Sequence, residues 1–375
     1  MTTDTGHEPT KRELLERLET IEDPDLGEDI VSLGLVNHVR VADGTATVSL
    51  AFNAPYAPTE VDLGERIREA VLDCGLEPEV TAHVGADQGF DEVVLPNVRN
   101  VVAVASGKGG VGKTTVAGNL AAGLNDRGAR VGILDADVHG PNVPRVLPVD
   151  GEPGVTPNDE LVPPRSEGVM VMSMRFLTEH ADDPAILRGP MVNNVMSKFL
   201  RGVEWGRLDY LIVDLPPGTG DASLDLLQTM PVTGALIVST PQRMSLDDAR
   251  KGIRMFEEHH VPILGVVENM ATFRCPNCED DHEVFGNEGT APLREDHDVP
   301  LAGRLPLHPD FGADGTERPV VREPDSDVHE VTSELVGTVA DRISEANRRT
   351  VADHRGSAGG DGESPEETAR TAGIK

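Results

Sequence analysis

The segment GKGGVGKT, residues 107–114, constrains the fold more than any other part of the chain. It fits the pattern G-x-x-x-x-G-K-[ST] of a phosphate-binding loop. An apolar run at 101–105 precedes it, and residues 114–128 follow with apolar side chains at helical spacing and a final glycine. The N–H groups of such a loop converge on phosphate oxygens where a strand leads directly into a helix N-terminus. The sequence therefore predicts an α/β fold with a nucleotide phosphate site between these two elements.

The residues of this loop have separate expected roles. Its glycines allow the close backbone approach that a phosphate group requires. Lys113 should bind the β- and γ-phosphates of ATP, and the hydroxyl of Thr114 should coordinate Mg2+. The predicted ATP-binding residues of the loop are Gly107, Lys108, Gly109, Gly110, Val111, Gly112, Lys113, Thr114 and Thr115.

Acidic residues follow two further apolar runs. The segment VGILDAD contains Asp135 and Asp137, and DYLIVD ends at Asp214. Because ligands bind at the carboxyl ends of the strands in such sheets, these side chains should lie beside the phosphates. We expect Asp214 to hold Mg2+ through a water and Asp137 to orient the attacking water, a role for which Asp135 competes. Asp137 thus joins Lys108 and Lys113 as a candidate catalytic residue.

Continuous apolar runs alternate with helical stretches beyond residue 92, which predicts parallel strands covered on both faces. The expected fold class is a doubly wound α/β domain with a mostly parallel sheet over residues 93–345. Residues 1–92 mix helical and strand patterns and predict a small α+β domain. Residues 346–375 have too few apolar side chains to offset the entropy of ordering, which predicts a disordered tail. The runs assigned to the sheet are 101–105, 131–134, 211–213, 235–238 and 263–267.

The charge of the chain limits its partners. The formal net charge is -32, and acidic residues are spread along the whole length. A polyanion would be repelled, and the sequence has no basic stripe, so we exclude nucleic acid. In dilute buffer such a surface would repel itself, whereas salt at about 1 M shortens the Debye length to about 3 Å and screens the repulsion. The composition therefore indicates adaptation to a high-salt cytoplasm, with an ordinary acidic protein as the alternative. The sequence has neither a run of about 18 apolar residues nor a secretory signal, so we expect a cytoplasmic protein without membrane partners.

Two of the three cysteines form a CxxC motif, CPNC, at Cys275 and Cys278. Iron–sulfur clusters and structural zinc sites generally need four ligands. Two thiolates from each of two subunits would supply four, so the motif favours a homodimer. A redox dithiol and a closed zinc knuckle remain alternatives, and His282 can serve as a third ligand. Cys74 ends a predicted helix of the small domain, where we expect a small buried apolar side chain.

The lysine at position 108 follows the first glycine of the loop directly. It resembles the additional lysine in the loop of the MinD/ParA-type ATPases, a class that includes the nitrogenase iron protein. In that class this lysine reaches across a dimer interface to the nucleotide of the other subunit. The resemblance implies that Lys108 acts in trans and that ATP closes a homodimer. A buried triphosphate also needs more positive charge than Lys113 alone supplies.

Longer stretches of residues 100–340 resemble the Mrp/ApbC family of iron–sulfur cluster carrier ATPases. The similarity lies in the loop, in LIVDLPPGTGD, in ENM and in the CxxC, which occur in the family's order. It implies a 4Fe–4S cluster bridged between two subunits by Cys275 and Cys278. It also implies transfer of that cluster to apo-proteins with ATP hydrolysis, and contact between Asn269 and the adenine ring.

The segment DPDLGEDIVSLGLV, residues 23–36, resembles the small domain that often precedes this ATPase and recurs in other iron–sulfur assembly factors. That domain often carries a cysteine in a PxCP turn, where this chain has Ala57 in NAPYAPTE. We therefore expect a docking role for it, with Asp23 and Asp25 as surface candidates. Capping between a helix and a loop is the alternative role for these two acids.

Two other functions use the same kind of loop. A positioning ATPase like MinD or ParA would need a C-terminal amphipathic helix or a basic patch, and the sequence contains neither. A reductase like the nitrogenase iron protein would need the same four thiolates as a carrier. The reductase therefore stays open as an alternative to the carrier.

Overall fold

The computed structural model describes residues 10–82, 94–137, 140–177, 189–275, 277–278, 280–286, 289–312 and 318–358. The chain forms two compact units. The first comprises Met1–Asn53, Val61–Ala86 and Asn347–Lys375, and the second comprises Ala54–Glu60 and Asp87–Ala346. The expected boundary at residues 92 and 93 lies outside the described residues and stays a prediction.

The second unit is built on an eight-stranded sheet with the order β15-β12-β11-β4-β10-β5-β9-β8. All neighbouring strands are parallel except β8 and β9, which are antiparallel. This architecture confirms the predicted doubly wound, mostly parallel sheet. Its strands are β4 (Val98–Ala105), β5 (Val131–Asp135), β8 (Arg165–Ser166), β9 (Val169–Ser173), β10 (Leu208–Asp214), β11 (Gly234–Ser239), β12 (Ile263–Glu268) and β15 (Leu301–Arg304).

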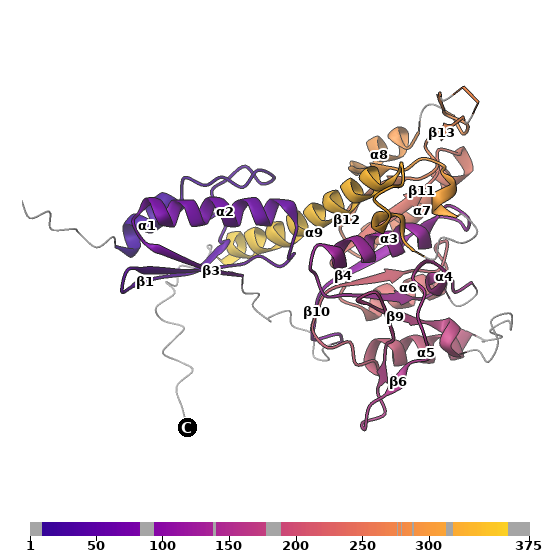
Figure 1. The fold of residues 1–375 in the computed structure, drawn as a ribbon, viewed down its shortest axis with the longest axis horizontal. Coiled ribbons are helices and arrows are strands. Elements are labelled where there is room, and N and C mark those ends of the chain that lie inside the picture. The colour runs from indigo at the N-terminus through magenta and orange to yellow at the C-terminus, as the bar shows by residue number, and fades with distance from the viewer. Residues whose placement is uncertain are drawn as a thin grey trace, which may run out of the picture. The chain divides into compact units, whose positions relative to one another are not determined.

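Helices cover both faces of this sheet (Figure 1). The central strand β4 explains why, because Val102 and Val104 enter one apolar core while Val101 and Ala103 enter another. Side chains of α3 and α9 complete the first core, and those of α5, α6 and α7 complete the second. The helices of this unit are α3 (Lys113–Asp126), α4 (Val143–Val146), α5 (Gly189–Arg201), α6 (Asp221–Thr229), α7 (Arg243–Glu258), α8 (Ala291–His297) and the first part of α9 (His329–Ala358), with 3-10 turns η1 (Met174–Leu177), η2 (Pro309–Phe311) and η3 (Val320–Arg322).

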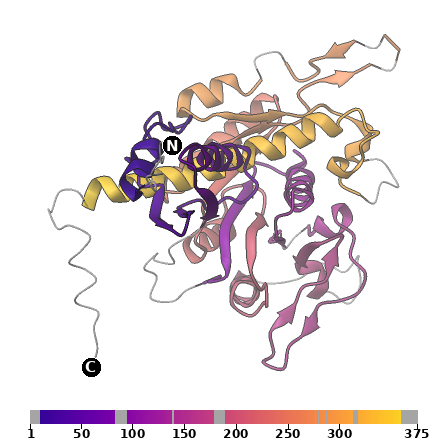
Figure 2. The ribbon, with the colours of Figure 1, turned by 60° about the vertical axis from the view of Figure 1, so that its left-hand side comes forward.

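Two short hairpins lie outside the large sheet. One pairs β6 (Gly154–Val155) with β7 (Leu161–Val162), and the other pairs β13 (Phe273–Arg274) with β14 (Asp281–His282). The second hairpin, drawn in orange, projects from the body of its unit in both views (Figures 1 and 2). The CxxC motif lies in this projecting hairpin.

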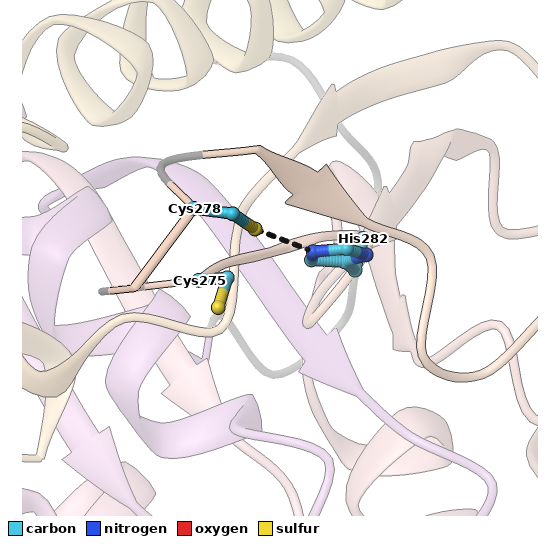
Figure 3. Close-up of side chains that lie close together, drawn as sticks. All are labelled: Cys275, Cys278 and His282. Atoms are coloured by element: carbon cyan, nitrogen blue, oxygen red, sulfur yellow. Dashed lines mark hydrogen bonds between the residues drawn. The ribbon is translucent and has the colours of Figure 1, made fainter.

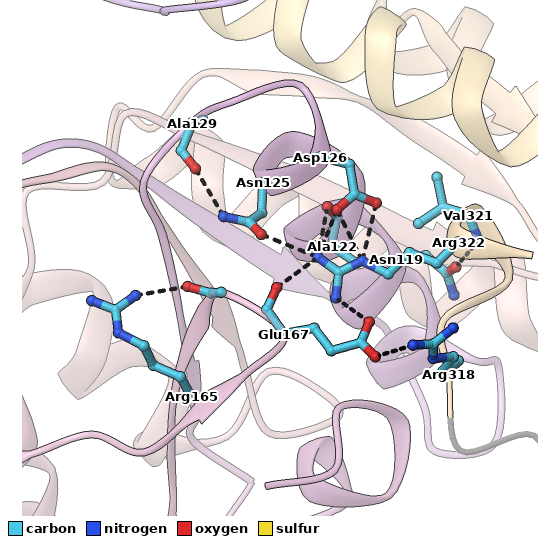
Figure 4. A network of polar contacts seen from close by, with 11 residues as sticks. Asn119, Ala122, Asn125, Asp126, Ala129, Arg165, Glu167, Arg318, Val321 and Arg322 are labelled. Carbon is cyan, nitrogen blue, oxygen red and sulfur yellow. Dashed lines mark hydrogen bonds and ion pairs between the residues drawn. The ribbon is translucent and has the colours of Figure 1, made fainter.

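Arg322 ties three segments of the second unit together (Figure 4). Its side chain is only 8% exposed, and its guanidinium lies 2.8 Å from Asp126 at the end of α3 and 3.3 Å from Glu167 between β8 and β9. Arg318 adds another ion pair with Glu167, at 2.5 Å. Charge-assisted networks of this kind contribute more than isolated surface pairs. This network holds the C-terminal end of the helix that begins at the phosphate-binding loop.

The first unit has a three-stranded sheet with the order β1-β2-β3, in which β1 and β2 are antiparallel and β2 and β3 are parallel. Leu14 and Leu18 of one helix and Leu63 and Ile67 of the next are fully buried against it, and Cys74 is partly buried there. Its elements are α1 (Lys11–Leu18), β1 (Val36–Ala42), β2 (Thr45–Leu50), α2 (Pro58–Asp73) and β3 (Glu77–Ala82).

The C-terminal segment differs from the sequence expectation. Disorder was expected from residue 346, but α9 continues to Ala358, and residues from 359 lie outside the described part of the chain. Val351 and Ala352 pack against the core of the first unit. Arg348 is fully buried there, with Nε 2.8 Å from Oδ2 of Asp23. The low apolar content was misleading because a few residues of this segment complete a core formed elsewhere in the sequence.

Asp23 and Asp25 were expected as exposed docking residues, and for Asp23 this is wrong. Asp23 is 0% exposed, and its carboxylate also accepts N–H groups from Asp25 and Leu26. Asp25 pairs with Arg348. Both acids therefore help to build the first unit. Ala57 is fully buried in the core of the second unit.

Among the described residues, no helix combines the length and apolar character that crossing a bilayer requires.

Replacing Arg348 with Met should destabilise the first unit, because it leaves the carboxylate of Asp23 buried without its cation. Removing one partner of a buried pair typically costs about 3–5 kcal/mol. Hydrogen exchange of the β1–β3 amides in high salt, on the full chain, measures the effect. Arg349→Met, at the exposed neighbouring position, is the control. Equal protection in both variants would show that the Arg348 pair contributes no net stability.

Candidate functional site

The phosphate-binding loop lies between β4 and α3, as predicted. Gly110 and Gly112 have φ angles of +79° and +84°, a left-handed conformation that glycine adopts without strain. A Cβ atom on Gly107 would lie 2.3 Å from the backbone carbonyl carbon of Asp248 in α7. Gly110 and Gly112 are therefore required by their backbone conformation, whereas Gly107 is required by the close approach of α7.

Lys113, Thr114 and Asp214 meet at the carboxyl edge of the sheet. Lys113 Nζ donates to Asp214 Oδ1 at 2.5 Å, and Thr114 Oγ1 donates to Asp214 Oδ2 at 2.6 Å. Asp214 is fully buried, and this burial raises its pKa, while Lys113 and the two hydrogen bonds act in the opposite direction. The structure thus brings together the two residues predicted to hold Mg2+ and the lysine predicted to bind phosphate.

Asp135 lies beside Asp214, because β5 and β10 pair with these two residues in register. Its Oδ2 accepts hydrogen bonds from Ser173 Oγ at 2.9 Å and from the Val143 N–H at 3.0 Å. Burial, followed by repulsion from Asp214, raises the pKa of Asp135 to about 7. Sequence reasoning missed Ser173, because β9 was not recognised as a strand of this sheet.

Asp137 is less buried than Asp135 and lies two residues beyond it. The N–H of Gly140 donates to its Oδ1 at 3.2 Å. Its charge contributes to the raised pKa of Asp214, so the two carboxylates are near enough to repel each other. Of the two competing acids, Asp137 is thus the more accessible and Asp135 the more enclosed.

Lys108 and Asn269 contact partners within the same chain. Lys108 Nζ donates to Gln242 Oε1 at 2.9 Å, just before α7 begins. Asn269 is buried, and its amide donates to the carbonyl of Val111 in the loop at 2.8 Å. Sequence reasoning did not single out Gln242, and the lysine it accepts from lies 134 positions away.

Cys275 and Cys278 lie in the loop of the β13–β14 hairpin, with His282 on the returning strand (Figure 3). Cys278 Sγ is 3.4 Å from His282 Nε2, and the donor atoms of all three residues lie within 4.8 Å of one another. Hydrogen bonds from the backbone at Cys278 and Asn277 lower the pKa of the Cys275 thiol, which favours the thiolate that binds metals. Cys278 and His282 are exposed, so the group is open to partners.

Replacing Asp135 with Asn should change how stability depends on pH. With a raised pKa, the folded protein keeps the Asp135 proton between about pH 4 and 7, where the unfolded chain has released it. The free energy of unfolding of the wild type should therefore fall relative to the variant as pH rises through this interval. Denaturant unfolding at several pH values in high salt measures this difference. For the exposed control Asp150→Asn, the difference in free energy of unfolding from the wild type should not change with pH. The same independence of pH for Asp135→Asn would contradict the prediction.

Two family models match the chain. Residues 97–340 match the model described as NUBPL iron-transfer P-loop NTPase, and residues 11–84 match that of iron–sulfur cluster assembly proteins. A protein of Synechocystis called "iron-sulfur cluster carrier protein" is 39% identical over 88% of this chain and 96% of its own. A protein of the same name from Deinococcus radiodurans is 41% identical over 88% and 95%.

A solved structure is also similar. It is a nucleotide-binding protein from Archaeoglobus fulgidus in complex with ADP, 35% identical, with a TM-score of 0.51 over 65% of this chain and 89% of that one. The resemblance drawn from the loop, the ENM segment and the CxxC is thereby confirmed. The chain belongs to the family of NUBPL-type iron-transfer P-loop NTPases.

Proposed function

We propose that this protein is an ATP-dependent carrier that binds a 4Fe–4S cluster on Cys275 and Cys278 and transfers it to apo-proteins. The observation that carries the proposal is the presence, in one compact unit, of a complete phosphate-binding loop and an accessible pair of thiols. Relatives called iron–sulfur cluster carriers share 95–96% of their length with this chain, which supports the same role.

Each group around the loop has a role in ATP binding. Backbone N–H groups of residues 107–115 and the ammonium of Lys113 bind the phosphates. Thr114 and Asp214 would hold Mg2+, and their oxygens, 2.6 Å apart, are the hard donors that this ion prefers. When bound there, Mg2+ would neutralise negative charge on the phosphates. We keep Asp137 as the residue that orients the attacking water, because it is the more accessible of the two acids.

Asn269 is proposed to contact adenine through the part of its side chain that remains available. Its amide N–H group already donates to Val111. The carbonyl oxygen of the same side chain can accept a hydrogen bond from an amino group, such as that of adenine. In this role Asn269 links the base to the loop that holds the phosphates.

A homodimer follows from the ligand count of the cluster. Each chain offers two thiolates in the CxxC, and a 4Fe–4S cluster generally takes four. Lys108 supports the same assembly if it contributes its charge to the nucleotide of the partner subunit. In the isolated chain Lys108 donates to Gln242. On dimer closure it would give up this acceptor and donate to the phosphates of the partner's nucleotide instead. A cytoplasmic location and apo-proteins as recipients belong to this proposal.

Anaerobic reconstitution with iron and sulfide in high salt should give about one 4Fe–4S cluster per dimer, since two CxxC motifs supply the four ligands. Cys275→Ala should abolish cluster binding, whereas Cys74→Ala, in the other unit, should not. Incubation of the loaded protein with an apo-enzyme should restore the activity of that enzyme.

Two results would count against the carrier. Unchanged cluster content in Cys275→Ala would exclude the CxxC as the binding site. A cluster that is retained while electrons pass to an acceptor would favour a reductase.

Lys108→Ala should retain ATP binding and lose both ATP turnover and cluster transfer, because its charge acts on the nucleotide of the partner subunit. Nucleotide titration, phosphate release and transfer assays separate these steps. Lys198→Ala, an exposed lysine on α5, is the matched control. Loss of ATP binding in Lys108→Ala would assign this lysine to the nucleotide of its own subunit.

A further inference from the structure

The register of the β13–β14 hairpin determines which side chains can meet at its tip. His282 pairs with Phe273, and the N–H of Cys275 donates to the carbonyl of Asp280 at 3.0 Å. Side chains alternate between the two faces of a strand, so Phe273, Cys275 and the paired His282 lie on the same face. A slip of one residue would turn His282 to the opposite face. The hairpin therefore places an imidazole beside the thiols.

The distances within this group suit one metal ion. Zinc–sulfur bonds of about 2.3 Å and zinc–nitrogen bonds of about 2.0–2.1 Å at tetrahedral angles imply a sulfur–nitrogen separation of about 3.6 Å. Cys278 Sγ and His282 Nε2 are 3.4 Å apart. All three donor atoms lie within 4.8 Å of one another, close enough for the three residues to share one ion.

We propose that Cys275, Cys278 and His282 of a single protomer bind one thiophilic divalent cation, with Zn2+ as the best match. Two thiolates and an imidazole favour zinc over magnesium or calcium, which prefer oxygen donors. Among the described residues the group contains three donors, so a fourth position remains for water or an incoming ligand. Figure 3 shows Cys278 pointing toward His282, with Cys275 next to them in the same loop.

This site goes beyond cluster carriage, although it uses the same thiolates. A cluster bridged by two CxxC motifs needs two protomers and does not need His282. The mononuclear site needs His282 and only one protomer. Because Cys275 and Cys278 cannot serve both at once, a chain loaded with zinc cannot accept a cluster. Metal stoichiometry and the effect of His282 therefore distinguish the two states.

The test is an anaerobic titration of the reduced full chain with Co2+ in high salt, followed by displacement with Zn2+. One cobalt ion per chain should bind, with thiolate-to-cobalt charge-transfer bands and the intense visible bands of a tetrahedral ion. His282→Ala should weaken zinc binding at least about 100-fold, since even loss of an outer-shell partner costs 10- to 100-fold. His282→Cys should restore tight binding, and His38→Ala, at an exposed position of β1, should not differ from the wild type.

Three results would overturn the proposal. They are one ion per two chains, zinc affinity in His282→Ala equal to that of the wild type, and cobalt spectra without tetrahedral bands. Cluster reconstitution of His282→Ala separates the site from the carrier function. If this variant loses zinc affinity but still takes up a cluster, both proposals stand. If the wild type binds zinc through His282 but neither the wild type nor His282→Ala takes up a cluster, only the carrier proposal fails.

Discussion

The parallel pairing of β10 with both β4 and β5 is the constraint on which the rest of the site depends. It ends three buried strands at the same edge of the sheet, so Asp214 lies between the loop that follows β4 and Asp135 at the end of β5. The neighbouring carboxylates of Asp135 and Asp214 repel each other. Lys113 offsets this repulsion at Asp214, while Asp135 is shielded by hydrogen bonds from β9 and from the start of α4. A change of register by one residue would disperse these groups.

The two chemical centres of the second unit differ in their surroundings. The groups around Asp214 are buried and hydrogen-bonded, which suits an arrangement that stays fixed during phosphate transfer. The thiols lie on a hairpin of two-residue strands that projects from the body of the unit. A carrier must release what it binds, and an exposed hairpin lets a recipient protein approach both cysteines directly. The nucleotide site is thus built from buried, fixed groups, whereas the thiols lie on an accessible hairpin of the same unit.

The local pattern of the sequence was sufficient for much of this structure. Strand, glycine loop and helix were predicted for residues 101–128, because apolar runs and glycine spacing are local signals. The missed features depend on distant residues. The run VMVMS of β9 could not be distinguished by pattern from other buried segments, so Ser173 was not connected with Asp135. Gln242 gives no signal of its contact with Lys108. Arg348 looked like part of a charged tail, because its partner Asp23 lies 325 positions earlier.

The pairing of Asp23 with Arg348 also has a consequence for synthesis on the ribosome. The N-terminal residues emerge first, but the guanidinium that neutralises Asp23 is translated only after the whole P-loop unit. Until then this carboxylate has to remain hydrated or protonated. The unit that contains Asp23 is therefore completed only after the second unit has been translated, in contrast to the usual N-to-C order of domain folding.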